Sequence, residues 1–135
     1  MCLVSSLIFN SFDIESIDNI ARIILHIDYD DAFVAYLNNV EIARSNIGNI
    51  GDYPTFNQGS TSLHEAQMYQ GGNPDQFLIN THVLKNTILP GDNILSSTTT
   101  RSLAIMACGG IGFKNITVYI LFIPHTSFHS TLRLS

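Results

Sequence analysis

The sequence lacks the features that mark several classes of protein. Its 135 residues include no tryptophan, two cysteines and only 13% charged residues, about half the usual share. Cys2 and Cys108 are too few for a disulfide framework and lack the spacing of a zinc knuckle or redox pair. The longest apolar run, residues 116–124, is about half of the roughly 18 residues that a membrane span needs. These absences argue against a disulfide scaffold and against a membrane span.

Basic residues are also scarce. Six Lys and Arg face eleven Asp and Glu, for a net charge of −5, which excludes the basic footprint of a nucleic-acid-binding protein. All eleven acids lie between Asp13 and Asp92, and residues 93–135 contain none. Such an uneven distribution of charge along the chain is typical of a functional tail or a domain boundary. The 45% apolar residues are enough for one core, so we expect a single domain over residues 1–135.

The sequence pattern predicts mainly short β-strands. Alternating or continuous apolar residues predict several strands and, before Pro90, a helix of about two turns. The predicted strands cover residues 22–29, 32–37, 40–45, 76–81, 93–95, 103–107 and 116–123, and the helix covers residues 82–89. The strand over 116–123 is apolar on both faces and is expected to be central in its sheet. Many short strands and one minor helix predict an all-β sandwich.

The segment from Ala32 to Ser45 predicts a β-hairpin. Asn38 and Asn39 tolerate positive φ and can form a two-residue type I′ turn. That turn pairs Leu37 with Val40, Ala35 with Ile42 and Phe33 with Arg44 on one face, which we expect to be the core face. It also pairs Tyr36 with Glu41 and Val34 with Ala43 on the other face.

This hairpin carries a family resemblance. Residues 25–46 read LHIDYDDAFVAYLNNVEIARSN, which resembles the Asp-Asp-Gly-Phe-Val-Ala-Tyr-Leu-Asn-Gly-Val-Glu-Val-Ala-Arg signature of bacterial galactose-binding-like jelly-roll modules. Residues 77–80 and 89–95 resemble the downstream strands, so the resemblance covers residues 12–95. It implies a galactose-binding-like jelly-roll β-sandwich. Such modules belong to secreted spore-coat-kinase-like, lamin-tail-containing and metallophosphatase-like proteins.

The chain departs from the family at several places. Ala32 and Asn39 stand where the family has Gly, and both are tolerable substitutions. After Leu95 the expected His-Asn and Ser-Ser-Asp are missing, where the acidic residues also end. Codons for Ser-Thr-Thr-Thr can read His-Asn-His in a shifted frame, so we hypothesise that residues 96–135 are a divergent or frame-slipped end. Residues 1–9 are expected to replace a lost first strand, which would leave the sandwich incomplete at its termini.

Acidic residues crowd the entrance to the predicted hairpin. Asp28, Asp30 and Asp31 could supply oxygen ligands to a structural Ca²⁺ ion. Alternatively, their carboxylates cap turn amides and pair with Arg22 or Arg44. Both interpretations remain open from the sequence.

The long segment 46–76 has no helical or strand periodicity, and long loops of this kind are often functional. Its aromatic and amide residues suit carbohydrate, because sugars present apolar C–H faces as well as hydroxyls. The candidate ligand-binding residues are Arg44, Tyr53, His64, Glu65 and Tyr69, with Phe56, Asn57, Gln58 and Gln70 nearby. The alternative is a loop whose aromatics simply anchor it.

No motif supports catalysis. The sequence has no Gly-x-Ser-x-Gly elbow, and His64 has no second histidine four residues on. We therefore expect a non-enzymatic carbohydrate-binding or adhesion module of a larger bacterial surface or secreted protein. It would act outside the cell, although residues 1–9 do not form a signal peptide. Its partners would be a glycan or neighbouring domains. The alternative is a structural module that self-assembles by strand addition, without a small-molecule ligand.

Overall fold

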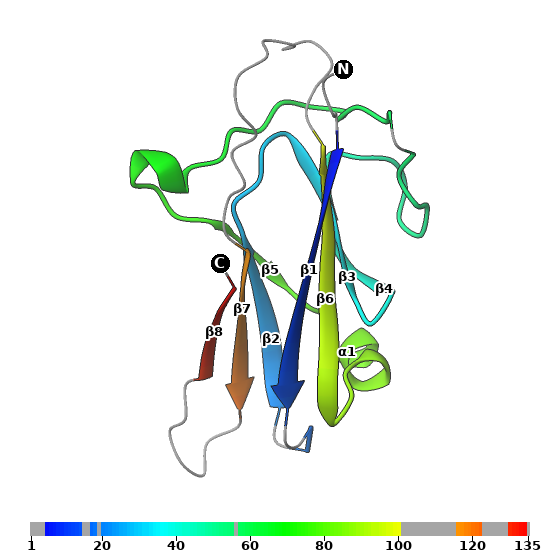
Figure 1. The fold of residues 1–135 in the computed structure, drawn as a ribbon, viewed down its shortest axis with the longest axis vertical. Coiled ribbons are helices and arrows are strands. Elements are labelled where there is room, and N and C mark those ends of the chain that lie inside the picture. The colour runs from blue at the N-terminus through cyan, green and yellow to red at the C-terminus, as the bar shows by residue number, and fades with distance from the viewer. Residues whose placement is uncertain are drawn as a thin grey trace.

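The protein is a sandwich of two antiparallel β-sheets. The computed structural model describes residues 5–14, 17–18, 20–55, 57–100, 116–122 and 130–134. Within them, each sheet contains four strands (Figure 1). The predicted all-β sandwich is thus confirmed. The predicted strand over 103–107, Phe56 and both cysteines lie outside the described residues.

Strand order defines the two sheets. Sheet A contains, in order, β1 (Ser5–Ile14), β6 (Gly91–Thr100), β3 (Ala32–Leu37) and β4 (Val40–Ser45). Sheet B contains, in order, β5 (Asp75–Leu78), β2 (Ile20–Ile27), β7 (Ile116–Phe122) and β8 (Ser130–Leu134). β7 therefore has a neighbour on each side, as its apolar sequence predicts.

The β3–β4 hairpin forms as predicted near its turn. Asn38 and Asn39 both have positive φ, 47° and 67°, and Leu37 pairs with Val40. Farther from the turn the predicted register is wrong, because a bulge lies between the pairs Tyr36–Glu41 and Ala35–Ala43. One extra residue on β4 shifts the pairing that follows it.

The shift changes which residues share a face. Val34 lies opposite Arg44, and Phe33 lies opposite Ser45 rather than Arg44. Arg44 therefore shares the outer face of the sheet with Val34 and Tyr36 instead of facing the core. This placement decides the environment of the candidate site described below.

β6 runs through the point where the family resemblance ends. Residues 96–100 continue the strand and pair with β1 on one side and β3 on the other. β1 pairs with β6 over ten residue pairs, from Ser5–Thr100 to Ile14–Gly91. The N-terminal segment thus supplies an outer strand of sheet A, and the departure after Leu95 does not interrupt the sheet.

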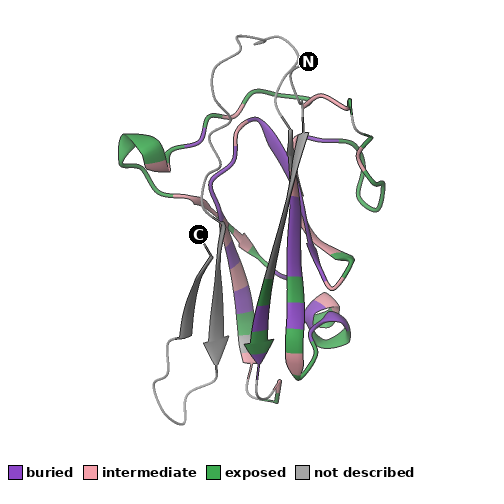
Figure 2. Cartoon of the chain, viewed as in Figure 1, coloured by how far each residue is buried: buried purple, intermediate pink, exposed green. Residues whose placement is uncertain are grey.

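The main core lies between the two sheets. Alternate residues of β2 and β3 point into it, and Figure 2 shows the resulting bands of buried residues along β2, whereas β3 is buried on both faces. Phe33 lies at its centre, with its ring 4.7 Å from that of Tyr29 and 5.0 Å from that of Phe77. The other buried members are Phe12, Ile14, Ile23, Leu25, Ile27, Ala35, Leu37, Ile79, Leu84, Ile88 and Leu95.

The helix α1 (Thr81–Thr87) closes one end of the sandwich. It begins one residue before the predicted position because the Asn80 side chain accepts a hydrogen bond from the backbone N–H of His82, a regular N-cap. Leu84 is buried on its inner side. The extended residue Ile88 follows, and Pro90 then prevents continuation.

Residues 46–74 cross the opposite end of the molecule and are largely irregular, as predicted (Figure 1). Their regular element is η1 (Met68–Gln70), a single 3₁₀ turn. The segment then enters β5, which begins and ends slightly earlier than the predicted strand over 76–81.

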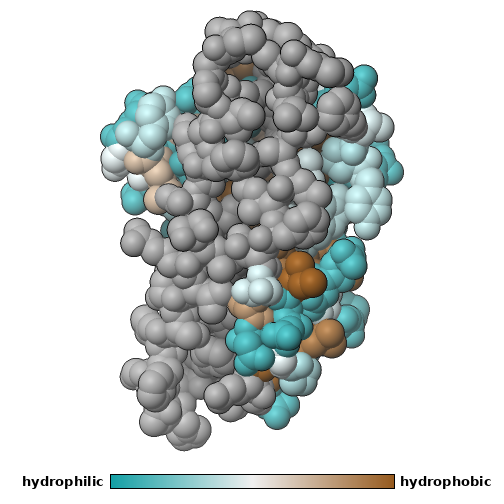
Figure 3. Space-filling view, viewed as in Figure 1, coloured by the Kyte–Doolittle hydropathy of each residue, from teal (hydrophilic) through white to brown (hydrophobic). Residues whose placement is uncertain are grey.

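On the face shown in Figure 3, the described residues are mainly hydrophilic. In Figure 3, apolar residues on this side form separate spots. None of the helices in the described ranges is long and apolar enough to cross a lipid bilayer.

Candidate functional site

The bend between β2 and β3 anchors the long segment. Asp28 is 3% exposed, and its carboxylate accepts hydrogen bonds from the backbone N–H groups of Gln67 at 2.6 Å and Met68 at 3.3 Å. A carboxylate that holds two backbone amides orders the turn that contains them. Asp28 thus holds the start of η1 against the sandwich.

Asp31 makes a second anchor. It has a φ of 62°, and its Oδ1 accepts from the backbone N–H of His64 at 3.0 Å. Its own N–H donates to the His64 carbonyl at 2.6 Å. Asn46 donates through Nδ2 to the Asp31 carbonyl at 2.9 Å, so Asp31 holds both the start of the long segment and His64 within it.

These contacts match the capping of turn amides in the second interpretation of the acidic residues, although Arg44 forms its salt bridge with Glu41. Asp28 and Asp31 hold backbone amides of the long segment, and Asp30 lies between them, half-buried. Across the described ranges, no group of three or more His, Cys, Asp or Glu side chains is arranged to hold a metal ion. The Ca²⁺ site remains a prediction.

His64 is held on both sides of its ring. Nδ1 lies 3.1 Å from the Tyr29 carbonyl oxygen, and Nε2 lies 2.9 Å from Asp75 Oδ2. The imidazole stacks on the Tyr29 ring, with centroids 3.9 Å apart and an angle of 8° between the planes. Each ring nitrogen thus lies within hydrogen-bond distance of one oxygen. His64 therefore connects the long segment to Asp75 in β5 and to Tyr29, just after β2.

Arg44 also has a holding role. Its Nε and Nη2 donate to the two carboxylate oxygens of Glu41, each at 2.9 Å. Nη1 donates to the Ile47 carbonyl at 2.8 Å, and Nη2 also donates to the Asp52 carbonyl. Four of the five guanidinium N–H groups are thereby used. The side chain is 7% exposed, so Arg44 positions residues 47–52 rather than facing solvent.

Glu41 is the partner of Arg44, and we call this pair of side chains the clamp. Its Oε2 also accepts from the backbone N–H of Gly51 at 3.0 Å. The hydrogen bonds from Arg44 are the main cause that lowers the pKa of Glu41, and the Gly51 amide adds to it, against the opposing effect of burial. The same pairing raises the pKa of Arg44. The clamp is therefore fully charged at neutral pH.

The clamp supports an exposed aromatic ring. Tyr53 stacks on Tyr36, with ring centroids 5.4 Å apart and 16° between the planes. Tyr36 is 8% exposed and Tyr53 is 72% exposed. The Tyr36 ring is therefore held by its surroundings, and the Tyr53 ring that stacks on it has a free face. We call Tyr53, stacked on Tyr36, the aromatic platform.

The platform has a packed base. Tyr36, Ala32, Val34 and Ile47 form a second buried cluster on the outer face of sheet A. Burial raises the pKa of Tyr36, and its hydroxyl, within the described part of the chain, has no hydrogen-bond partner. Packing of this kind keeps the ring in one place before any ligand arrives.

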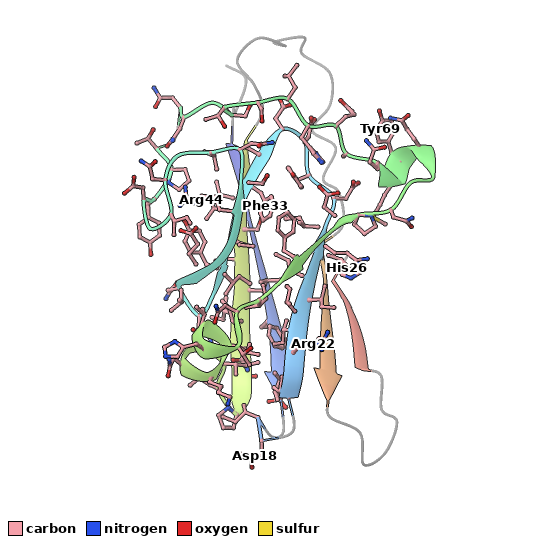
Figure 4. The ribbon with its side chains drawn as sticks, turned by 180° about the vertical axis from the view of Figure 1, so that it is seen from behind. Asp18, Arg22, His26, Phe33, Arg44 and Tyr69 are labelled. Atoms are coloured by element: carbon pink, nitrogen blue, oxygen red, sulfur yellow. The ribbon has the colours of Figure 1, made fainter. Side chains whose placement is uncertain are left out.

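Glu65 and Tyr69 form a separate group at η1. The Tyr69 hydroxyl donates to Glu65 Oε1 at 3.1 Å, and this bond is the main cause that raises the pKa of Tyr69. Gln70 donates to the same hydroxyl. Figure 4 shows Tyr69 and Arg44 on opposite sides of this end of the molecule. The predicted ligand-binding residues therefore fall into two groups that do not share one surface.

Some residues of the site escape sequence reasoning. Residues three apart in a regular strand point to opposite faces, so Glu41 and Arg44 give no signal of a pair. The bulge in β4 brings them to the same face. Asp75 lies eleven residues from His64, so the sequence gives no signal that the two side chains meet.

Comparison with known proteins adds nothing to this geometry. No protein-family model, curated protein or solved structure matches the chain.

Proposed function

We propose that this chain is a non-catalytic carbohydrate-binding or adhesion module of a larger bacterial surface or secreted protein. The aromatic platform is the observation that carries the proposal. The proposal also draws on the resemblance of residues 12–95 to galactose-binding-like jelly-roll modules, which act as binding units outside the cell.

A fixed and exposed ring suits a sugar ligand. A pyranose has an apolar C–H face that packs on an aromatic ring, while its hydroxyls hydrogen-bond to polar groups at the rim. Tyr53 is already stacked on Tyr36, so little side-chain freedom is lost on binding. Asp52 lies beside it in the chain and is exposed, which provides an acceptor for sugar hydroxyls.

The other polar candidates fit supporting roles. Asp28, Asp31 and Arg44 are each engaged with backbone groups of residues 46–74. His64, which lies within that segment, contacts the Tyr29 carbonyl and Asp75. In the proposed module they shape the surface that meets the ligand and perform no chemistry. If Ca²⁺ binds near Asp30, it would serve the same structural purpose.

Glycan-array binding of the purified chain tests the proposal. Tyr53→Ala should weaken binding of the selected glycan about tenfold, because the stacking surface is lost. Tyr69→Ala, which removes the exposed ring on the other side, is the matched control and should change binding less than twofold. The array is run with and without Ca²⁺, and light scattering gives the mass.

Two outcomes would overturn the proposal. Absence of selective glycan binding, together with a defined oligomer or filament, would move the function to self-assembly by strand addition. Glycan binding that survives Tyr53→Ala unchanged would place the ligand elsewhere and remove the platform from the argument.

A further inference from the structure

The charge around the platform narrows the class of ligand. Residues 23–84 contain seven acidic side chains and a single cationic one, Arg44, for a formal charge of −6 with histidine neutral. This stretch includes the whole of the long segment and the hairpin below it. The segments that carry the platform therefore have an excess of negative charge.

The one cation in this stretch is already committed. Arg44 gives three N–H bonds to Glu41 and to the Asp52 carbonyl, and a fourth to the Ile47 carbonyl. Bidentate pairing with a carboxylate neutralises its charge locally. With 7% of its side chain exposed, it is not placed to receive a ligand carboxylate.

The turn that carries Tyr53 bears an exposed carboxylate, which also lies within electrostatic range of Arg44. Asp52 adjoins Tyr53 in the chain and is exposed, and its Oδ2 accepts a hydrogen bond from the neutral amide of Asn49 at 3.2 Å. A hydrogen bond from an amide leaves the negative charge in place. The backbone of the same turn is fixed, since the Asp52 carbonyl accepts from Arg44.

We infer that the platform selects sugars by charge: it binds amine-bearing sugars best, neutral sugars next and acidic sugars worst, with Asp52 as the residue that sets this order. The inference rests on the proposed carbohydrate-binding function and adds the ligand class to it. In this inference, a sugar ring on Tyr53 places its substituents near the carboxylate of the preceding residue, Asp52. There an ammonium group is attracted and a carboxylate is repelled by about 1 kcal/mol or less in water, or roughly three- to fivefold in affinity.

Immobilised galactosamine, galactose and galacturonic acid test the order, because the three surfaces share one ring and differ in charge. The full chain should bind them in that order, with roughly three- to fivefold steps. Raising the salt from 50 to 500 mM should compress the steps, since exposed charges are screened. Binding to galactose should hardly respond to salt.

Asp52→Asn tests the assigned residue. Asparagine retains an oxygen that accepts from Asn49, so the turn has no reason to change. Galactosamine binding should fall about threefold and galacturonic acid binding should rise by a similar factor, while galactose binding is unchanged. Asp18→Asn is the matched control: Asp18 is exposed at the opposite end of the molecule (Figure 4), and the same loss of charge there should leave the order intact.

The outcomes separate this inference from the proposal beneath it. If none of the three sugars and no other glycan binds, the proposed function fails and this inference fails with it. If sugars bind in a Tyr53-dependent way but without the charge order, or with galacturonic acid first, the function stands and the charge selection is overturned. An order that Asp52→Asn and Asp18→Asn change equally would show that overall charge, and not Asp52, sets it.

Discussion

At the scale of single residues, Asn93 shows how one buried amide joins three parts of the fold. It is fully buried, and its Oδ1 accepts from Asn38 Nδ2 and from the backbone N–H of Leu89, each at 2.8 Å. Its Nδ2 donates to the carbonyls of Leu89 and Gly91, each at 2.8 Å. Every polar atom of the side chain is satisfied, so the β3–β4 turn, the end of α1 and the start of β6 are held together.

Removing this side chain should be costly. Asn93→Ala leaves the Leu89 amide and two carbonyls without their partner in a partly buried place, so we expect a loss of about 1 to 3 kcal/mol in the free energy of unfolding. Urea denaturation measures it. Asn73→Ala, at an exposed position of the long segment, should change stability by less than about 0.5 kcal/mol. Equal effects of the two substitutions would refute the role given to Asn93.

Asn38, which donates a hydrogen bond to Asn93, shows what the sequence predicts for a single residue and what it does not. The tolerance of asparagine for positive φ predicts the turn position of Asn38, and the structure confirms it. Its side chain, however, also contacts residues about fifty positions away in the chain, Thr87 and Asn93. The residue type alone predicts the backbone conformation of Asn38. Its contacts with Thr87 and Asn93 depend instead on how the sheets and the helix pack together.

At the scale of elements, β4 decides the surface of the candidate site. A hairpin without a bulge would place Arg44 on the core face, opposite Phe33, where an arginine would be expensive to bury. The bulge instead moves Arg44 to the outer face, opposite Val34 and beside Glu41. The resulting clamp holds residues 47–52, and through them it places Tyr53 on Tyr36.

The clamp should make stability depend on pH in a defined direction. Because folding lowers the pKa of Glu41 from its ordinary value of 4.5, the charged pair stabilises the fold fully above that value. The stabilisation is lost as the pH falls through the lower pKa of the folded state. Glu41→Gln should therefore be about 1 kcal/mol less stable than the parent at pH 7, and this difference should shrink below about pH 4.5.

Urea denaturation of both proteins from pH 7 to pH 3 measures the effect. The quantity of interest is the difference between the two proteins, because other carboxylates titrate equally in both. A difference that stays constant down to pH 3 would contradict the assignment of the lowered pKa to the Arg44 pairing.

At the scale of the whole molecule, the sandwich depends on strands from distant parts of the chain. β1 pairs with β6, which begins 77 residues after β1 ends, and β2 pairs with β5 and β7. Phe12 and Ile14 of β1 enter the main core, whereas Ser11 and Asp13 are exposed. The N-terminal segment is thus part of the core and not an appendage to it.

Two adjacent substitutions test this place of β1. Phe12→Ala removes a large side chain that is 6% exposed, and we expect a loss of about 3 to 4 kcal/mol in the free energy of unfolding. Asp13→Ala lies on the solvent side of the same strand and should change it by less than about 0.5 kcal/mol. Thermal or urea unfolding followed by circular dichroism compares the two. Similar, small effects would mean that β1 does not pack on the core.

By itself, the sequence determined the features that depend on neighbours in the chain. The alternation of apolar residues specified the strands β2, β3 and β4, paired asparagines specified the hairpin turn, and the absence of periodicity specified the long segment 46–74. Only the tertiary structure decided the bulge in β4, the order of strands in the two sheets, and the separation of Arg44 from Tyr69. The physical reason is that local pattern sets backbone preference and burial, whereas pairing register and the packing of a loop depend on free-energy differences among contacts that form only when distant segments meet.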